Sequence, residues 1–70
     1  MARYILDYFS LPTGYGWSKD TDNLAEIRRF IKGINRETCS AALSVWDNKK
    51  SDFIYDKEAY AYKARVDKLF

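Results

Sequence analysis

Residues 10–23 read SLPTGYGWSKDTDN, and the way this stretch folds decides how the whole chain is organised. It follows an apolar segment and precedes a helical pattern. Pro12 has no N–H to donate to a sheet, and Gly14 and Gly16 permit a tight or left-handed backbone. We therefore interpret residues 10–20 as a loop that joins a strand to a helix.

The segments on both sides of this loop have clear periodicities. Residues 3–9, RYILDYF, are rich in β-branched and aromatic side chains, which predicts a strand. Beyond the loop, apolar residues recur at helical spacing from Leu24 onward, and Gly33 is a typical residue just past a helix C-terminus. The sequence therefore predicts a helix at about 22–32. Its N-cap is expected at one of three residues, Asp20, Thr21 or Asp22.

The second half of the chain predicts a hairpin and a helix. Residues 39–46, CSAALSVW, are expected to form a strand, 47–51 a turn and 52–56 the return strand. The apolar side chains of both strands stand at odd-numbered positions. They lie on the same face of the sheet only if the loop between the strands has an odd number of residues, three or five. Asp56 then caps an amphipathic helix at about 57–69, whose apolar residues have spacings of 3, 4, 3 and 1.

The predicted fold is α+β, with the order β-α-β-β-α in one domain spanning residues 1–70. The economical packing is a three-stranded, mostly antiparallel sheet with both helices on one face. The first strand can join beside the last strand, antiparallel, or beside the middle strand, parallel through a right-handed crossover. The sequence does not choose between them. The expected core is Tyr4, Leu6, Tyr8, Leu24, Ile27, Ile31, Leu43, Val45, Phe53, Tyr55, Tyr62, Val66 and Leu69.

The composition argues against catalysis and against metal binding. The chain has no histidine, which removes the commonest metal ligand and general base, and Cys39 is its only cysteine. We therefore expect no enzyme, no catalytic residue and no cofactor or metal. A lone GYG is not a phosphate-binding motif, and Asp20 and Asp22 would repel an anion. With no signal peptide or membrane span expected, a cytoplasmic location follows.

Aromatic residues are the outlying feature, at 17% of the chain. In the predicted packing the sheet face away from the helices carries an apolar, aromatic centre with a charged rim, which is typical of interaction sites. That face is predicted to hold Ile5, Phe9, Ala42, Ser44, Trp46 and Ile54, fringed by Arg3, Asp7, Asp52 and Asp56.

We predict a small non-enzymatic protein-binding module. Its size and missing chemistry favour an inhibitor of the phage or mobile-element type, which occludes a larger host protein or defence complex. The expected partner-binding residues are Phe9, Tyr15, Trp17, Trp46 and Ile54. The alternatives are a homodimer through this face, or cover of the face by a chain terminus or by the 10–20 loop.

Nucleic-acid binding is the alternative function. The net charge of +2, from 12 basic and 10 acidic residues, is too small to indicate nucleic-acid binding by itself. An open sheet bearing aromatic side chains could nevertheless stack bases. The acidic fringe opposes phosphates, and the signature segments of common RNA-binding domains are absent. The residues expected to serve this alternative are Arg28, Arg29, Lys32, Arg36, Lys49 and Lys50.

Overall fold

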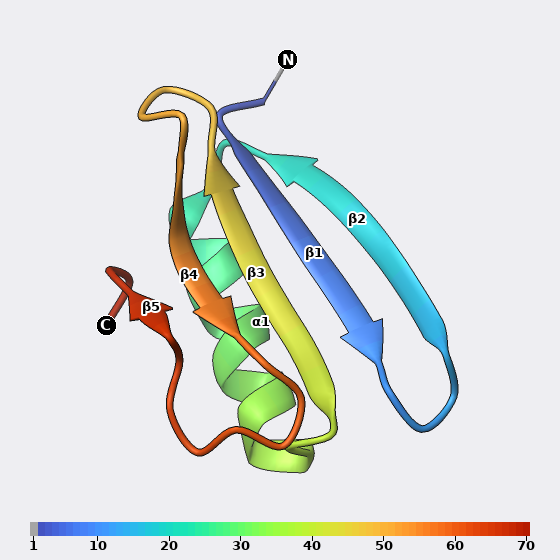
Figure 1. Ribbon diagram of the computed structural model, residues 1–70. Coiled ribbons are helices and arrows are strands. Elements are labelled where there is room, and N and C mark those ends of the chain that lie inside the picture. The colour runs from blue at the N-terminus through green and yellow to red at the C-terminus, as the bar shows by residue number, and fades with distance from the viewer. Residues whose placement is uncertain (1) are drawn as a thin grey trace.

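The computed structural model describes residues 2–70 and shows one helix packed on a five-stranded antiparallel sheet (Figure 1). The strands lie side by side in the order β2-β1-β3-β4-β5. The α+β class is confirmed, whereas the predicted three strands and two helices are wrong. The elements in chain order are β1 (Tyr4–Ser10), β2 (Tyr15–Thr21), α1 (Leu24–Glu37), β3 (Ala41–Asp47), β4 (Asp52–Lys57) and β5 (Val66–Asp67).

The glycine-rich stretch forms a β-hairpin and not a loop into a helix. Residues 11–14 make the turn, in which Gly14 has a φ of 69° and its N–H donates to the Ser10 carbonyl at 2.8 Å. β2 then pairs with the whole of β1, starting with Ser10 opposite Tyr15. Because β2 reverses the chain before α1 begins, β3 returns antiparallel to β1 on its other side. The first strand does lie beside the predicted middle strand, as one of the two alternatives had it, but antiparallel and not parallel. The other alternative, pairing with the last strand of the hairpin, is wrong.

Gly16 has a packing role in this hairpin. A Cβ at this position would lie 2.9 Å from the Tyr8 carbonyl oxygen and 3.0 Å from Cδ2 of Phe9. Real Cβ atoms essentially never approach other heavy atoms so closely, so a larger residue would displace the Phe9 ring or the β1 backbone. The second glycine therefore serves the close approach of an aromatic ring.

α1 begins and ends later than the sequence predicted. Asn23, and not a residue of 20–22, is the N-cap, and its side chain accepts from the Glu26 N–H at 3.1 Å. The helix also continues through Gly33, which is therefore not a terminating residue. Ile34 lies beyond it and packs against the core. We infer that burial of this turn outweighs the roughly 1 kcal/mol that a glycine costs inside a helix.

The hairpin of β3 and β4 is closed by a loop of four residues, 48–51, so the predicted odd loop is wrong. The apolar faces match instead through a register shift between Val45 and Trp46. Trp46 pairs with Phe53, whereas Val45 pairs with Tyr55. The extra residue on β4 is a β-bulge, which changes the facing of every residue after it.

Because of the bulge, Phe53 and Ile54 face the opposite sides of the sheet from those predicted. Phe53, predicted in the core, is 39% exposed on the face away from α1. Ile54, predicted on that outer face, is 5% exposed and belongs to the core. A one-residue slip moves side chains between faces because the period of a strand is two.

The second predicted helix, at 57–69, is absent. β4 extends to Lys57, residues 58–65 are irregular, and β5 pairs with β4 along the edge of the sheet. Leu69 enters the core, but Tyr62, predicted there, is fully exposed. α1 already covers the inner face, so the apolar stripe of a second helix has nothing to bury against, and a short helix without such burial is marginal.

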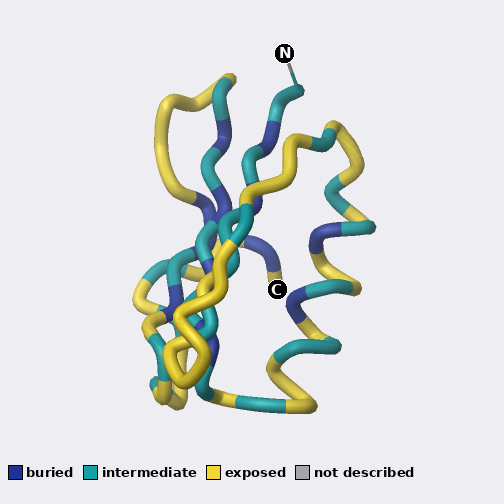
Figure 2. The backbone as a smooth tube through the Cα atoms, turned by 90° about the vertical axis from the view of Figure 1, so that its right-hand side faces the viewer, coloured by how far each residue is buried: buried dark blue, intermediate teal, exposed yellow. Residues whose placement is uncertain are grey.

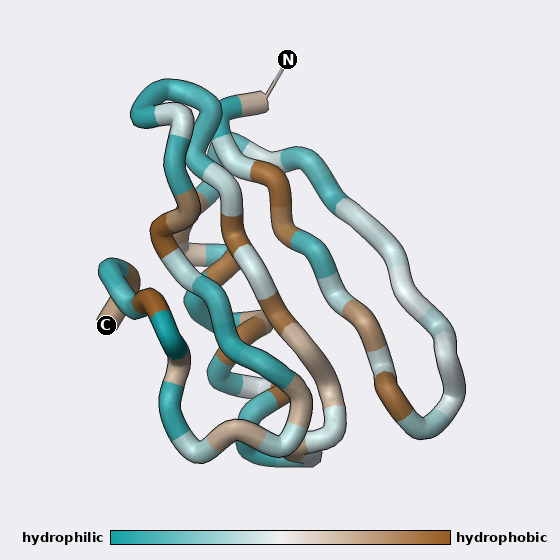
Figure 3. Tube along the Cα trace, viewed as in Figure 1, coloured by the Kyte–Doolittle hydropathy of each residue, from teal (hydrophilic) through white to brown (hydrophobic). Residues whose placement is uncertain are grey.

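The core lies between α1 and the facing side of the sheet (Figure 2). Core-facing positions alternate along β1 and β3 and recur on α1. Figure 3 shows in brown that each of these three elements carries strongly apolar residues. Tyr8 and Leu24 from the predicted core are only partly buried, and Val66 is half-buried on β5. The buried cluster is Tyr4, Leu6, Ile27, Ile31, Leu43, Val45, Ile54, Tyr55 and Leu69.

An ion pair closes the end of the sheet where β3 turns into β4. Asp47 is 1% exposed, and its two carboxylate oxygens accept from Nε and Nη2 of Arg3 at 3.2 and 3.1 Å. The Lys49 N–H also donates to this carboxylate at 2.9 Å. The Arg3 hydrogen bonds lower the pKa of Asp47 below its usual value, against the opposing effect of burial.

We predict that Asp47→Asn destabilises the protein more at neutral pH than in acid. Because the folded-state pKa of Asp47 is depressed, its contribution is present above about pH 4 and is lost as the pH falls through the folded pKa. Urea unfolding at about pH 7 and about pH 3 measures the free energy of unfolding of both proteins. The difference between wild type and variant should be smaller at the acidic pH. Asp20→Asn, at an exposed carboxylate on β2, is the control. An equal gap at both pH values would contradict the prediction.

Candidate functional site

The sheet face opposite α1 has no helix or second sheet over it in the described part of the chain (Figure 2). We call this surface the open face. The strand register arranges its side chains in three rows that run across the strands. The first row is Gly16, Phe9 and Ala42; the middle row is Ser18, Asp7, Ser44 and Asp56; the third row is Asp20, Ile5, Trp46 and Phe53.

The first and third rows carry exposed aromatic rings. Phe9 is 44% exposed and lies against Gly16. Trp46 and Phe53 meet edge to face with their ring centroids 5.0 Å apart, and the Trp46 indole N–H donates to the Asn48 side chain at 3.0 Å. The open face therefore has an aromatic group on each side of its middle row.

The middle row is polar and acidic. The Ser18 hydroxyl donates to the Asp7 carboxylate, which holds that side chain in place on the sheet. Arg65 pairs with Asp56 and also approaches Glu58, with 3.6 Å between Nη1 and Oε1. The exposed Arg65 guanidinium thus faces two carboxylates, and Asp7 adds a third carboxylate to the row without a cation paired to it among the residues that the structure describes.

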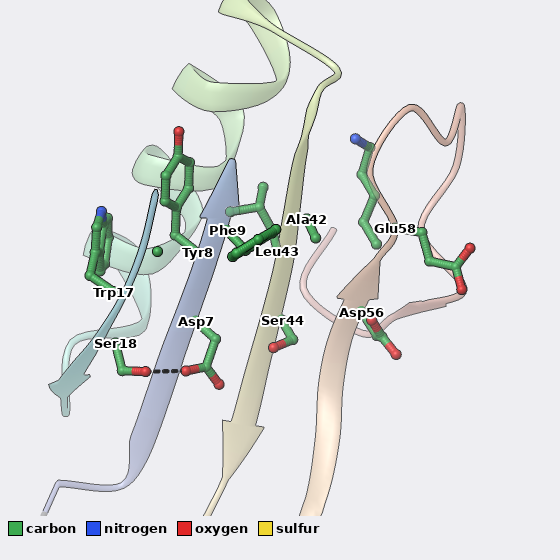
Figure 4. A pocket seen from close by; sticks show the side chains of 12 residues that line it. Asp7, Tyr8, Phe9, Trp17, Ser18, Ala42, Leu43, Ser44, Asp56 and Glu58 are labelled. Carbon is green, nitrogen blue, oxygen red and sulfur yellow. Dashed lines mark hydrogen bonds between the residues drawn. The ribbon is translucent and has the colours of Figure 1, made fainter. Parts of the chain in front are cut away.

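A hollow of about 460 Å³ joins the acidic row to the first aromatic ring. In Figure 4, Phe9 lies beside Ala42 and Leu43, while Asp7, Ser44 and Asp56 follow one another across the strands. Glu58 and the buried Lys57 border the same hollow. Carboxylates beside an aromatic ring suit an ammonium or guanidinium group, which can form charge-assisted hydrogen bonds and a cation–π contact.

The two loop aromatics predicted as partner contacts are not on the open face. Trp17 points to the α1 side, where it stacks on Tyr8 with centroids 5.3 Å apart and meets Phe30 edge-on at 5.2 Å. It is half-buried and extends the core toward the β2 edge. Tyr15 follows the same alternation, on the α1 side of β2, and is exposed.

Of the five predicted partner-binding residues, the structure places only Phe9 and Trp46 together on the open face. Ile54 is buried in the core, as described above. Phe53 was missed, because only the bulge turns it outward and no residue pattern marks a bulge here. Glu58 was missed because it was expected on a helix.

Two residues of the predicted rim also lie elsewhere. Arg3 bonds to the buried Asp47, on the α1 side of β3. Asp52 lies at the hairpin end of β4, 3.7 Å from the Lys68 ammonium.

The basic residues proposed for nucleic acid do not form one group. Arg28 donates to the Leu69 carbonyl at 3.0 Å, and the Lys32 ammonium lies 5.4 Å from the centroid of the Phe70 ring. Both side chains therefore hold the C-terminal segment against α1. Arg29 and Arg36 are exposed on the helix, with Arg36 in its last turn. Lys49 and Lys50 lie in the turn at the other end of the helix, beside Arg3, whose N–H bonds to Asp22 just before α1.

No cluster of three or more potential metal ligands occurs within residues 2–70. Over the same residues, no helix combines the length and apolar character needed to cross a bilayer. Comparison with protein-family models, curated proteins and solved structures gives no significant match. The candidate site therefore rests on the geometry of the open face.

We predict that Trp17→Ala destabilises the fold by about 2–3 kcal/mol, because it removes a half-buried ring from contact with Tyr8 and Phe30. The matched control is Tyr15→Ala on the same strand face, which should change stability by less than about 0.5 kcal/mol. Urea unfolding followed by far-UV circular dichroism measures both. Wild-type stability in Trp17→Ala would mean that the ring has no structural role and is free to contact a partner.

Proposed function

We propose that the chain is a small non-enzymatic protein-binding module that docks its open face on a larger protein. A basic side chain of the partner occupies the hollow between Phe9 and Asp56, and the aromatic pair of Trp46 and Phe53 packs beside it. The supporting observation is the uncovered sheet face, on which exposed aromatic rings flank a row of carboxylates. Aromatic anchors surrounded by polar groups are the usual anatomy of a binding hot spot.

The charge of the open face argues for a basic partner. Asp7, Asp20 and Asp56 lie on it and Glu58 borders it, while the cations beside the row are the exposed Arg65 and the buried Lys57, so carboxylates outnumber cations by four to two. Complementary charge gives an interface its orientation and speeds encounter. A surface carrying lysine or arginine therefore fits this face better than an acidic or purely apolar one.

The same charges argue against a homodimer through this face. A two-fold axis would bring each acidic row against its own copy, and like charges in apposition cost several kcal/mol at an interface. A second copy of the chain is therefore a poorer occupant than a basic partner.

An inhibitory action is the simplest that the proposal allows. A domain that docks through its open face can occlude a functional surface of a larger protein or complex without any chemistry of its own. The phage or mobile-element type of inhibitor is part of this proposal, and its support is the lack of catalytic signatures in the sequence together with the uncovered sheet face.

Nucleic-acid binding, the alternative, has less support. The aromatic rings that could stack bases lie among carboxylates, whereas the exposed basic residues lie on the helix and the hairpin turn. A stacking platform normally combines aromatic rings with cations that follow the backbone. Binding of this kind would weaken steeply with salt, and its absence with mixed oligonucleotides removes the alternative.

We predict that Phe9→Ser combined with Phe53→Ser abolishes capture of the partner, because both exposed rings leave the open face. Tagged wild type and variants are incubated with lysate, and the captured proteins are identified. The double variant should retain its fold by circular dichroism and lose the partner by at least about tenfold, the size expected for hot-spot residues. The captured protein should carry a basic surface and dissociate more readily at high salt.

The matched control is Leu11→Ser combined with Tyr15→Ser, which removes two exposed apolar side chains of the first hairpin away from the open face. It should capture the partner as wild type does. Equal capture by the open-face variant, or loss in the control variant alone, contradicts the proposal. Sedimentation provides the second readout: a dimer that Phe9→Ser dissociates would place a second copy on the open face and overturn the larger-partner proposal.

A further inference from the structure

A second hollow lies on the other side of β4, away from the open face. It measures about 710 Å³ and is enclosed by the last turns of α1, by β4 and β5, and by the irregular segment 58–65. Small-molecule sites usually occupy about 300–1,000 Å³. We call this hollow the Lys57 cavity. Its walls are Asn35, Cys39, Tyr55, Lys57, Tyr60 and Phe70, together with parts of 61–64 and Asp67.

The ammonium of Lys57 is the unusual group in this cavity. Lys57 is only 6% exposed, and its Nζ is the buried side-chain polar atom without a hydrogen-bond partner among residues 2–70. Burying an unpaired ammonium is costly, and most buried lysines pair with a carboxylate. Asn35 brings the C-terminal end of α1 to the same cavity, where the helix dipole favours a cation but supplies no hydrogen bond to it.

Tyr55 provides a second donor beside this ammonium. It lies two residues before Lys57 on the same face of β4, which is roughly 6.6 Å along a strand. The Asn35 amide donates to the Tyr55 hydroxyl oxygen at 3.3 Å, so the hydroxyl proton remains for another acceptor. Burial raises the pKa of Tyr55, which keeps that proton in place at neutral pH.

We propose that the Lys57 cavity binds a small organic monocarboxylate. Its carboxylate pairs with the Lys57 ammonium and accepts from the Tyr55 hydroxyl, and its apolar or aromatic body packs among the exposed rings of Tyr60, Tyr62 and Phe70 that border the cavity. Lys57 also lines the first hollow, and it is the one residue that the two hollows share. This inference nevertheless does not rest on the proposed function, because the remaining walls of the Lys57 cavity take no part in the open face.

The charges of the walls select a single negative charge. Lys57 is the buried cation, and Lys63 lies exposed on the wall. Asp67 also lines the cavity, with its carboxylate fixed by the N–H groups of Leu69 and Phe70 at 3.1 Å each. A phosphate dianion would face that carboxylate with only one buried ammonium to balance it. A monocarboxylate matches the ammonium one to one.

The test is an NMR titration of the ¹⁵N-labelled chain with phenylacetate, its neutral analogue phenylacetamide, and inorganic phosphate. Phenylacetate should move the amide signals of Asn35, Cys39, Lys57 and Tyr60 saturably, with a dissociation constant on the order of millimolar for a ligand of about ten heavy atoms. Phenylacetamide, which lacks the charge, should bind at least about tenfold more weakly.

Two lysine variants locate the charge that matters. Lys57→Met keeps an unbranched side chain and removes the ammonium, so it should weaken phenylacetate binding by at least about tenfold. Lys63→Met, at the exposed lysine on the same wall, should bind within about twofold of wild type, because exposed pairs contribute little.

Stability gives an independent readout. Lys57→Met should have a higher urea midpoint than wild type, because it removes an unpaired buried charge. Phenylacetate should raise the midpoint of wild type and leave that of Lys57→Met unchanged. Lys57→Gln, with the same expected loss of binding, replaces the methionine variant if that one does not fold.

Equal binding of the acid and the amide, wild-type affinity in Lys57→Met, or no saturable shift at the four residues overturns the proposal. Shifts produced by phosphate and not by phenylacetate also overturn it, since they would assign the cavity to a phosphate-bearing ligand. The open-face variant with Phe9→Ser and Phe53→Ser should bind phenylacetate as wild type does, so the failure of either proposal is recognised separately.

Discussion

The antiparallel pairing of β1 with both β2 and β3 along its entire length is the constraint on which the rest of the structure depends. It places β1 inside the sheet and fixes which of its side chains face α1. Tyr4, Leu6 and Tyr8 point inward and support the core, so the residues between them must point outward. The acidic row and the first aromatic ring of the open face are thus direct consequences of the alternation that builds the core.

The β-bulge in β4 determines, on the other side of β3, which side chains of β4 face α1 and which face outward. Without the one-residue shift, the pairing of Trp46 with Phe53 would continue, and Lys57 would face outward while Asp56 faced α1. With the shift, Asp56 joins the acidic row and the Lys57 ammonium is buried beside the end of α1. One irregularity therefore adds Asp56 to the acidic row and buries the unpaired cation of the cavity.

The elements with strong periodicity could be predicted from the sequence, namely β1, most of α1, and the β3–β4 hairpin. β2 could not, because Gly16, Lys19 and Asp20 are poor strand formers, and we infer that the strand forms because β1 offers it a complete partner edge. The prediction of a helix at 57–69 was wrong for the opposite reason. Its apolar residues do have helical spacing, but α1 covers the inner face of the sheet, so a second helix has no apolar surface to pack against. Phe9 and Trp46 were placed correctly, since the alternation of regular strands is sufficient for them. The facings of Phe53 and Ile54 depend on the bulge, which composition and spacing do not encode.

Asp56 and Lys57 show how closely the two candidate sites are linked. They are consecutive residues of one strand, of opposite charge, on opposite sides of the sheet. Arg65 pairs with the first from solvent, whereas the second has no hydrogen-bond partner among residues 2–70. A register slip of one residue would exchange them, burying a carboxylate and exposing the ammonium on the open face. The buried apolar residues that precede them, Ile54 and Tyr55, prevent this exchange, because the same slip would bring Tyr55 out into water. Core packing therefore holds a charge in an unfavourable position, which is the arrangement expected where a buried group serves a ligand and not the fold.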